Sequence, residues 1–156
     1  MRILQLHSNF IEYEVVEKEI ALAEEPEKKK ERLEELAVLF TAVEKGDDTE
    51  VARKAMESTK ESLDKLKVNR VLIYPYAHLS SNLAKPADAL KILDEMKNVA
   101  KKLGLETYST AFGWCKKFSV SIKGHPLAEH LRIITSDSVE EESVCEALKA
   151  EEKLCS

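Results

Sequence analysis

Three short polar segments of this sequence interrupt or follow apolar runs and could carry chemistry. Residues 74–81 read YPYAHLSS, residues 112–118 read FGWCKKF, and residues 123–130 read KGHPLAEH. Ligands commonly bind at the ends of strands in open sheets, where polar segments of this kind meet. We therefore consider these three segments, all within residues 68–134, as candidate ligand-binding segments, and the candidate catalytic residues are taken from them.

Each segment contains one residue suited to catalysis, and each of these has a structural alternative. His78 suits a general base or a hydrogen-bonding clamp, or it caps the following helix. Lys116 lies near Phe112 and Trp114 in the sequence. If it is buried beside them, either its pKa is lowered, or it stays protonated and stabilises an oxyanion. A lysine exposed on a strand is the commoner case. Glu129 could orient that lysine, recognise a ligand amine, or form a surface salt bridge. The candidate catalytic residues are thus His78, Lys116 and Glu129.

The residue spacing does not support other kinds of catalytic site. His125 and His130 flank Glu129, but positions five apart lie about 140° around a helix rather than on one face. No GxSxG elbow or glycine-rich phosphate loop occurs, and no signature identifies a partner for Cys115, which we interpret as a pocket wall. The sequence therefore predicts no metal, no cofactor and no Ser or Cys nucleophile.

The hydrophobic pattern predicts the elements that must position these residues. Strands are expected over residues 2–7, 10–16, 36–43, 71–74, 106–111, 117–122 and 131–135, and helices over 49–67 and 86–103. The first two strands should form a hairpin turned at Ser8-Asn9, and the Glu/Lys-rich residues 17–35 should be a solvated loop or short exposed helix without function. Because this order is not strict βαβ alternation, we expect an α/β fold with a mixed, mainly antiparallel sheet and two helices packed on it.

Composition favours one cytoplasmic domain, and the charge distribution leaves two explanations open. The chain has 156 residues and a net charge of −5, and it shows no apolar run long enough for a membrane span or signal peptide. Residues 68–134 carry 10 basic and 5 acidic groups, whereas both flanking parts have a net charge of −5. Nucleic acid would suit this basic middle, although surface helices that merely differ in sign explain it too. Residues 139–156 look like an acidic linker or loose C-terminal helix, which leaves 1–138 as the domain.

Four motifs together resemble a known family over residues 1 to about 135. They are His7-Ser8-x-x-Ile11-Glu12-Tyr13, Val43-Glu44-Lys45, YPYAHLSS at 74–81 and KGHPLAE at 123–129. This set is similar to the N-terminal editing domain of archaeal threonyl-tRNA synthetases. The resemblance implies a D-aminoacyl-tRNA deacylase-like fold and the hydrolysis of serine wrongly esterified to tRNA(Thr). Such editing makes physical sense, because one missing methyl gives only about 1–3 kcal/mol of discrimination in a binding site.

The resemblance also assigns roles to the candidate residues. It implies that Lys116 lies beside the scissile ester, that His78 holds the terminal ribose or the reacting water, and that Glu129 faces the substrate or Lys116. Water would attack directly, assisted by the 2′-hydroxyl of the terminal adenosine. Some relatives carry an aromatic hydroxyl where this chain has Cys115. A shift of the strand register by one residue would turn Lys117 inward in place of Lys116. The substrate-binding residues implied are Val43, Pro75, Tyr76, Ala77, Phe112 and Cys115.

The implied partners follow from the same resemblance. They are the 3′ end of tRNA(Thr) carrying serine and the remainder of a synthetase, with no membrane. A homodimer is expected because sheet edges in a fold this small often pair. Two alternatives stay open, namely a noncatalytic tRNA-binding or dimerising appendage and a freestanding D-aminoacyl-tRNA deacylase.

Overall fold

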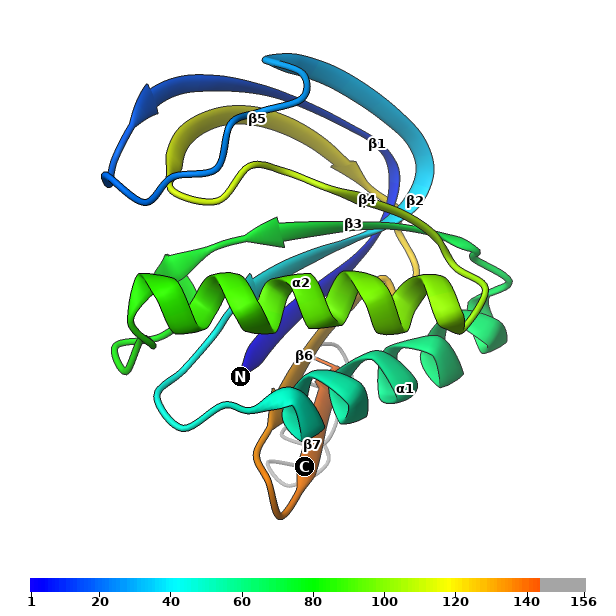
Figure 1. The fold of residues 1–156 in the computed structure, drawn as a ribbon. Coiled ribbons are helices and arrows are strands. Elements are labelled where there is room, and N and C mark those ends of the chain that lie inside the picture. The colour runs from blue at the N-terminus through cyan, green and yellow to red at the C-terminus, as the bar shows by residue number, and fades with distance from the viewer. Residues whose placement is uncertain (144–156) are drawn as a thin grey trace, which may run out of the picture.

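A computed structural model describes residues 1–143, which form one mixed seven-stranded sheet with two helices on one face (Figure 1). The strand order is β4-β3-β2-β1-β6-β7, and β5 also pairs with β1. The α/β class predicted from the sequence is therefore confirmed: β2–β3 and β3–β4 are parallel pairs, and the other pairs are antiparallel. The elements are β1 (Arg2–Lys18), β2 (Lys30–Ala42), α1 (Thr49–Leu66), β3 (Arg70–Pro75), the 3-10 turn η1 (Ala77–Leu79), α2 (Pro86–Lys102), β4 (Glu106–Ser109), β5 (Trp114–Ile122), β6 (Glu129–Ile134) and β7 (Val139–Ser143).

Strand β1 is one continuous strand, so the predicted hairpin at Ser8-Asn9 is wrong. Its first half pairs with β6 and its second half with β5, while β2 runs along the other side. The ladder with β5 skips one residue between Ser8 and Phe10, which is where the partner changes. Such a bulge bends a strand without reversing it, and the upper half of the sheet curls over accordingly (Figure 1).

Strand β2 begins at Lys30, within the segment that the sequence predicted to be a loop. Its first part is mostly exposed and rich in Glu and Lys, so the alternation of apolar and polar residues typical of a strand is weak there. Leu33 is buried in this part, and the Tyr13 hydroxyl donates a hydrogen bond of 2.7 Å to Glu31 Oε2. Of the predicted loop at residues 17–35, the part outside regular structure is thus residues 19–29.

The later part of β2 has both of its faces buried. Ala37 and Leu39 pack toward the helices, whereas Val38 and Phe40 pack into a second apolar cluster on the other face of the sheet. A strand buried on both faces reads as a continuous apolar run, which explains why residues 36–43 lack alternation.

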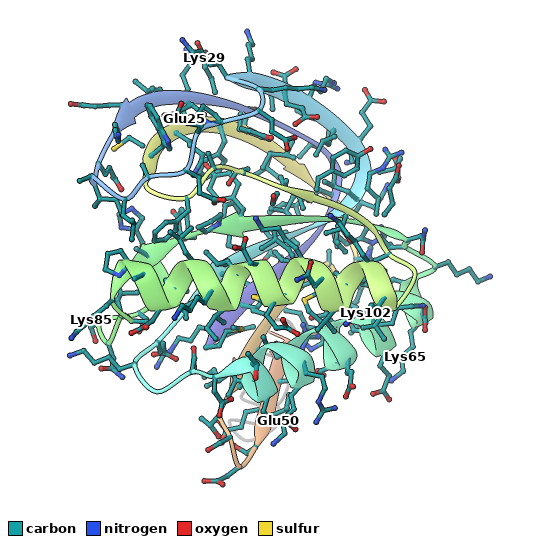
Figure 2. All side chains as sticks on the ribbon, viewed as in Figure 1. Glu25, Lys29, Glu50, Lys65, Lys85 and Lys102 are labelled. Atoms are coloured by element: carbon teal, nitrogen blue, oxygen red, sulfur yellow. The ribbon has the colours of Figure 1, made fainter. Side chains whose placement is uncertain are left out.

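Both helices match their sequence signals and cover the same face of the sheet (Figure 1). The Asp48 side chain caps α1 by accepting a bond from the Val51 N–H, and Pro86 opens α2. Met56 and Met96 are fully buried between helices and sheet. Figure 2 shows charged side chains such as Lys65 pointing outward from the helix ends. None of the helices in residues 1–143 is long and apolar enough to cross a membrane.

The first residues of the predicted acidic linker, Val139–Ser143, form strand β7 and pair with β6. The prediction of a linker or loose helix is therefore wrong for these residues. The reason is electrostatic: Arg132 on β6 is fully buried and donates a 2.8 Å hydrogen bond to Glu141 Oε1. The Arg132 guanidinium also donates to Gln5 Oε1 and Thr59 Oγ1, each at 3.1 Å. The rest of the predicted linker lies outside the described residues.

Candidate functional site

The ends of β2 and β3 open into a cavity of about 190 Å³. The two strands are parallel, so their carboxyl ends meet at one edge of the sheet. The Tyr76 N–H donates to the Thr41 carbonyl at 2.8 Å, and the Ala84 N–H donates to the Val43 carbonyl at 3.0 Å. Six of the nine predicted site residues line this cavity, namely Val43, Pro75, Tyr76, Ala77, Phe112 and Lys116.

The first residues of β5 and the turn before them form the opposite wall, against the connection that follows β1. The Glu19 N–H donates to the Gly113 carbonyl at 2.9 Å, and the Trp114 Nε1–H donates to the Glu24 carbonyl at 2.7 Å. Gly113 has a φ of 86°, and a Cβ atom there would lie 2.8 Å from Ile20 Cγ1 and 2.9 Å from Ala23 Cα. Only glycine allows this close approach.

This wall contains residues that the sequence analysis missed. Glu19 and Ile20 line the cavity, although residues 17–35 were expected to have no function. The long-range pairing of the segment with Gly113 and Trp114 brings it there. Nothing local in a Glu/Lys-rich stretch reveals such pairing; the Phe112-Gly113-Trp114 turn was the one signal that a second segment approaches closely.

Lys116 is half-buried and directed inward. Its Nζ atom lies 4.9 Å from the centroid of the Tyr74 ring and 3.5 Å from the Trp114 carbonyl oxygen. Burial lowers the pKa of Lys116 to about 8, while the carboxylates of Glu19 and Glu24 act in the opposite direction. Lys117 on the other face is exposed and forms an ion pair with Glu14 at 3.1 Å. The strand register therefore turns Lys116, and not Lys117, into the cavity.

His78 lies on η1 beside the cavity and is exposed. Its ring contacts the Tyr76 ring edge-on, with the centroids 5.1 Å apart. The turn is held by a 2.6 Å hydrogen bond from Ser80 Oγ to Glu44 Oε2. Helix α2 has Lys85 at its N-cap and no side-chain cap there, so the interpretation of His78 as a helix cap is wrong.

Besides His78, two predicted residues do not line the cavity. Cys115 is exposed and donates a hydrogen bond of 2.8 Å from its thiol to Glu19 Oε1, so it contacts the wall from outside. Glu129 is exposed at the start of β6, where it pairs with Leu6 of β1, whereas Lys116 pairs with Val15. The two residues thus pair with positions nine residues apart along β1.

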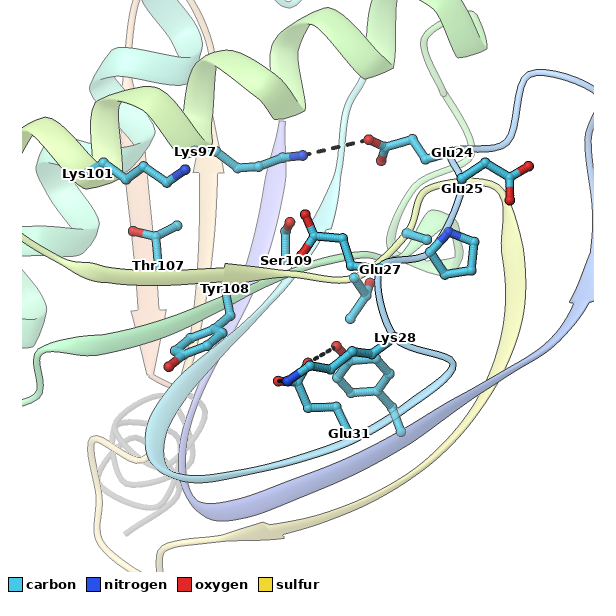
Figure 3. A pocket seen from close by; sticks show the side chains of 14 residues that line it. Glu24, Glu25, Glu27, Lys28, Glu31, Lys97, Lys101, Thr107, Tyr108 and Ser109 are labelled. Carbon is cyan, nitrogen blue, oxygen red and sulfur yellow. Dashed lines mark hydrogen bonds and ion pairs between the residues drawn. The ribbon is translucent and has the colours of Figure 1, made fainter.

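A second cavity, of about 280 Å³, is lined by residues of the same connection, of α2 and of β4 (Figure 3). Glu24 lines this second cavity: its Oε1 accepts a 3.1 Å hydrogen bond from the Phe112 N–H, and its Oε2 lies 3.8 Å from Lys97 Nζ. Among residues 1–143, no group of three His, Cys, Asp or Glu side chains is placed to hold a metal ion. The groups near the first cavity that could take part in chemistry are thus Lys116, which is directed inward, Glu19 and the exposed His78.

Residues 1–134 match the family model of the archaea-specific editing domain of threonyl-tRNA synthetase. The chain belongs to this family. Its relatives include the threonine–tRNA ligase of Nitrosopumilus maritimus, which is 48% identical over 155 residues covering 97% of this chain and 25% of the ligase. The threonine–tRNA ligase of Thermococcus sibiricus is 44% identical over all of this chain and 26% of its own length.

A third relative of this editing domain is named as an editing subunit. The threonine–tRNA ligase editing subunit of Saccharolobus solfataricus is 44% identical over 98% of this chain and 39% of its own length. The present chain therefore spans about a quarter of the two ligases and less than half of the editing subunit. The family assignment made from the sequence motifs is confirmed.

Proposed function

We propose that this editing domain hydrolyses the ester bond between L-serine and the terminal adenosine of tRNA(Thr). The observation that carries the proposal is the inward, half-buried Lys116 in a cavity at the strand ends, lined by five of the six predicted substrate-binding residues. A protein of the editing-domain family with an inward cation and no Ser or Cys nucleophile in that lining suits direct attack by water on an ester.

The reaction needs stabilisation of one developing charge. Water adds to the ester carbonyl, the carbonyl oxygen becomes an oxyanion, and the bond to the ribose oxygen then breaks. The products are serine and a free ribose hydroxyl, which takes up the proton lost by the attacking water. With a pKa of about 8, Lys116 is protonated in roughly nine-tenths of molecules at pH 7 and donates to the oxyanion.

The other residues act on the substrate's position. His78, exposed on η1 next to Tyr76, holds the terminal ribose or the reacting water, and the adenosine 2′-hydroxyl assists the attack. Val43, Pro75, Ala77 and Phe112 shape the wall around the amino acid. A hydrolytic step adds a second selection against serine to the modest selection that a missing methyl permits.

The proposed partners are the remainder of a threonyl-tRNA synthetase, the aminoacylated 3′ end of tRNA(Thr) and a second copy of the chain. In a homodimer, Glu129 of one copy would face the Lys116 cavity of the other copy, since the two residues pair with positions nine residues apart along β1 within one chain. Mixing Lys116→Met and Glu129→Gln chains tests this directly. Partial recovery of activity in the mixture, with neither variant active alone, would support sites shared between two copies.

Deacylation assays on the intact chain test the function. L-seryl-, L-threonyl- and D-seryl-tRNA(Thr) are compared for the unaltered chain and for Lys116→Met and His78→Ala, with tRNA binding measured in parallel. The matched control is Lys117→Met, which removes a neighbouring exposed lysine. We expect rapid loss of L-serine that collapses only in the Lys116 and His78 variants. Binding of tRNA without hydrolysis by the intact chain would favour a noncatalytic appendage, and faster D-seryl hydrolysis a D-aminoacyl-tRNA deacylase.

A further inference from the structure

Two of the sequence motifs meet at a pair of histidines outside the cavity. His7 begins the first motif, on β1, and His125 lies within the KGHPLAE motif, in the connection between β5 and β6. The His7 Nδ1 and His125 Nε2 atoms are 2.8 Å apart, which is hydrogen-bond distance. The two rings meet edge-on with their centroids 5.0 Å apart. Neither ring lines the cavity that contains Lys116, so the pair is separate from the proposed site.

The pair joins the middle of this connection to β1. The ends of the connection are attached to His7 through the backbone: the Lys123 N–H donates to the His7 carbonyl, and the His7 N–H donates to the Ala128 carbonyl, both at 2.8 Å. Between these two points, residues 124–127 form a loop that is mostly exposed. The His125 side chain extends from this loop to His7 and thus ties a largely exposed segment to the sheet.

The hydrogen bonds around the pair define where its protons lie. The Leu127 N–H donates to His125 Nδ1 at 3.3 Å, so this nitrogen carries no proton when the pair is neutral. The proton of the neutral His125 ring is therefore on Nε2, which donates it to His7 Nδ1. One further proton can bind at His125 Nδ1, which costs the bond from Leu127 but keeps the bond between the rings. A second one at His7 Nδ1 places two N–H groups face to face and breaks that bond.

The charged groups around His7 oppose the second proton. Burial of the ring lowers the pKa of His7 below 6.5, and His125 and Lys123 act in the same direction. The Glu35 carboxylate on β2 raises this pKa, but its effect is weakened by an ion pair of 3.0 Å with Lys123 Nζ. On β6, Glu129 pairs with the residue before His7. Two imidazolium ions in contact also repel each other, so the second proton drives the rings apart.

We propose that the His7–His125 pair is a proton-sensitive latch, which fixes the connection between β5 and β6 to β1 until both rings are protonated. This inference goes beyond the proposed function, because neither histidine lines the cavity. The segment that the latch controls contains Leu127, an exposed apolar side chain, and leads directly into Glu129. Release therefore changes the surface presented at this end of the molecule, while the backbone hydrogen bonds to His7 keep both ends of the connection in place.

Three variants separate the latch from the general effect of acid. In His7→Asn the side-chain oxygen replaces Nδ1 as the acceptor but binds no proton, so the bond from His125 should survive in acid. His7→Ala and His125→Ala remove this bond at every pH. NMR measures backbone order parameters at residues 124, 125 and 127 from neutral pH down through the titration of both rings, and the protonation of the isotope-labelled imidazoles is followed in the same samples. The amides of β6 show whether the fold stays intact.

At neutral pH the unaltered chain and His7→Asn should have order parameters of about 0.85 at these residues, as in rigid backbone, and both alanine variants should fall below about 0.6. In acid the unaltered chain should fall to the level of the alanine variants with the midpoint of His7 protonation, whereas His7→Asn should stay rigid. Equal rigidity of the alanine variants at neutral pH would overturn the inference, because other contacts would then hold the connection. Loss of order in His7→Asn at the same pH as in the unaltered chain would also overturn it, since another group, such as Glu35, would then be the sensor.

Discussion

Replacing Lys116 with Met should stabilise the fold while it removes the proposed activity. The Lys116 ammonium is half-buried over the Tyr74 ring, and burial lowers its pKa from the ordinary 10.5 to about 8. A depressed lysine pKa means that folding disfavours the charged form. Since the unfolded chain is protonated up to about pH 10.5, Lys116 weakens the fold below pH 8.

The size of the effect follows from that difference in pKa. A drop of about 2.5 corresponds to about 3 kcal/mol, and water at the open side of the cavity reduces this to about 1–3 kcal/mol. Met is an apolar, unbranched side chain one heavy atom shorter than Lys, so it fills most of the same space without the charge. The free energy of unfolding should therefore rise by that amount at pH 7, which corresponds to roughly 2–10 °C in Tm for a chain of this size.

Urea denaturation, followed through the fluorescence of Trp114 in the cavity wall, measures the difference at several pH values. The gain should be complete at pH 7 and should shrink as the pH rises from 8 toward 10.5, because the unfolded lysine then loses its proton as well. Lys117→Met is the control, since Lys117 is 73% exposed and its ion pair with Glu14 contributes little. An equal gain in the control, a loss of stability in Lys116→Met, or a gain independent of pH would refute the reasoning.

Three further predictions follow from the same contacts. If protonated Lys116 stabilises the oxyanion, catalysed deacylation corrected for the background should be level below pH 8 and fall above it; a rate that rises up to pH 8 would mark a neutral base. Gly113→Ala should cost about 1–3 kcal/mol in denaturation, because the added Cβ strains the backbone and meets Ile20, whereas Gly104→Ala, with similar φ but open space, should cost less. Arg132→Met should lower the free energy of unfolding by about 3 kcal/mol, because Glu141 and Gln5 lose their buried partner; an unchanged Tm would contradict this.

The elements that the sequence predicted best are those whose signals are local. Both helices carry a local start signal, Asp48 for α1 and Pro86 for α2, and an apolar stripe. Val71–Tyr74 is short and apolar enough to be a buried strand in any context. The start of β2 at Lys30 was missed because its surface-facing Glu and Lys residues resemble a solvated loop. What makes that part a strand is pairing with distant β1, which composition does not encode.

The hairpin error has a similar cause. Ser8-Asn9 has the composition of a turn, but Ser8 is buried and its hydroxyl donates to the Leu6 carbonyl at 2.9 Å, within a strand that continues. A bulge and a turn use the same residue types, and the choice between them depends on which strands lie alongside. Here β6 and β5 succeed each other along β1, so the strand bends and goes on.

For the site, the sequence motifs predicted the residues of β2, β3 and β5 that line the cavity, whereas Glu19 and Ile20 were found only from the structure. Residues of β2, β3 and β5 reach the cavity from regular strand ends, and their positions follow from the order of the strands. Glu19 reaches it only because Gly113 lacks a side chain and lets the connection after β1 lie against the turn before β5. A cation buried at a strand end needs a countercharge, and the chain provides it from a segment with no motif of its own. The inward position of Lys116 is thus set by the register of β5 on β1, and the approach of Glu19 depends on a tertiary contact at one glycine.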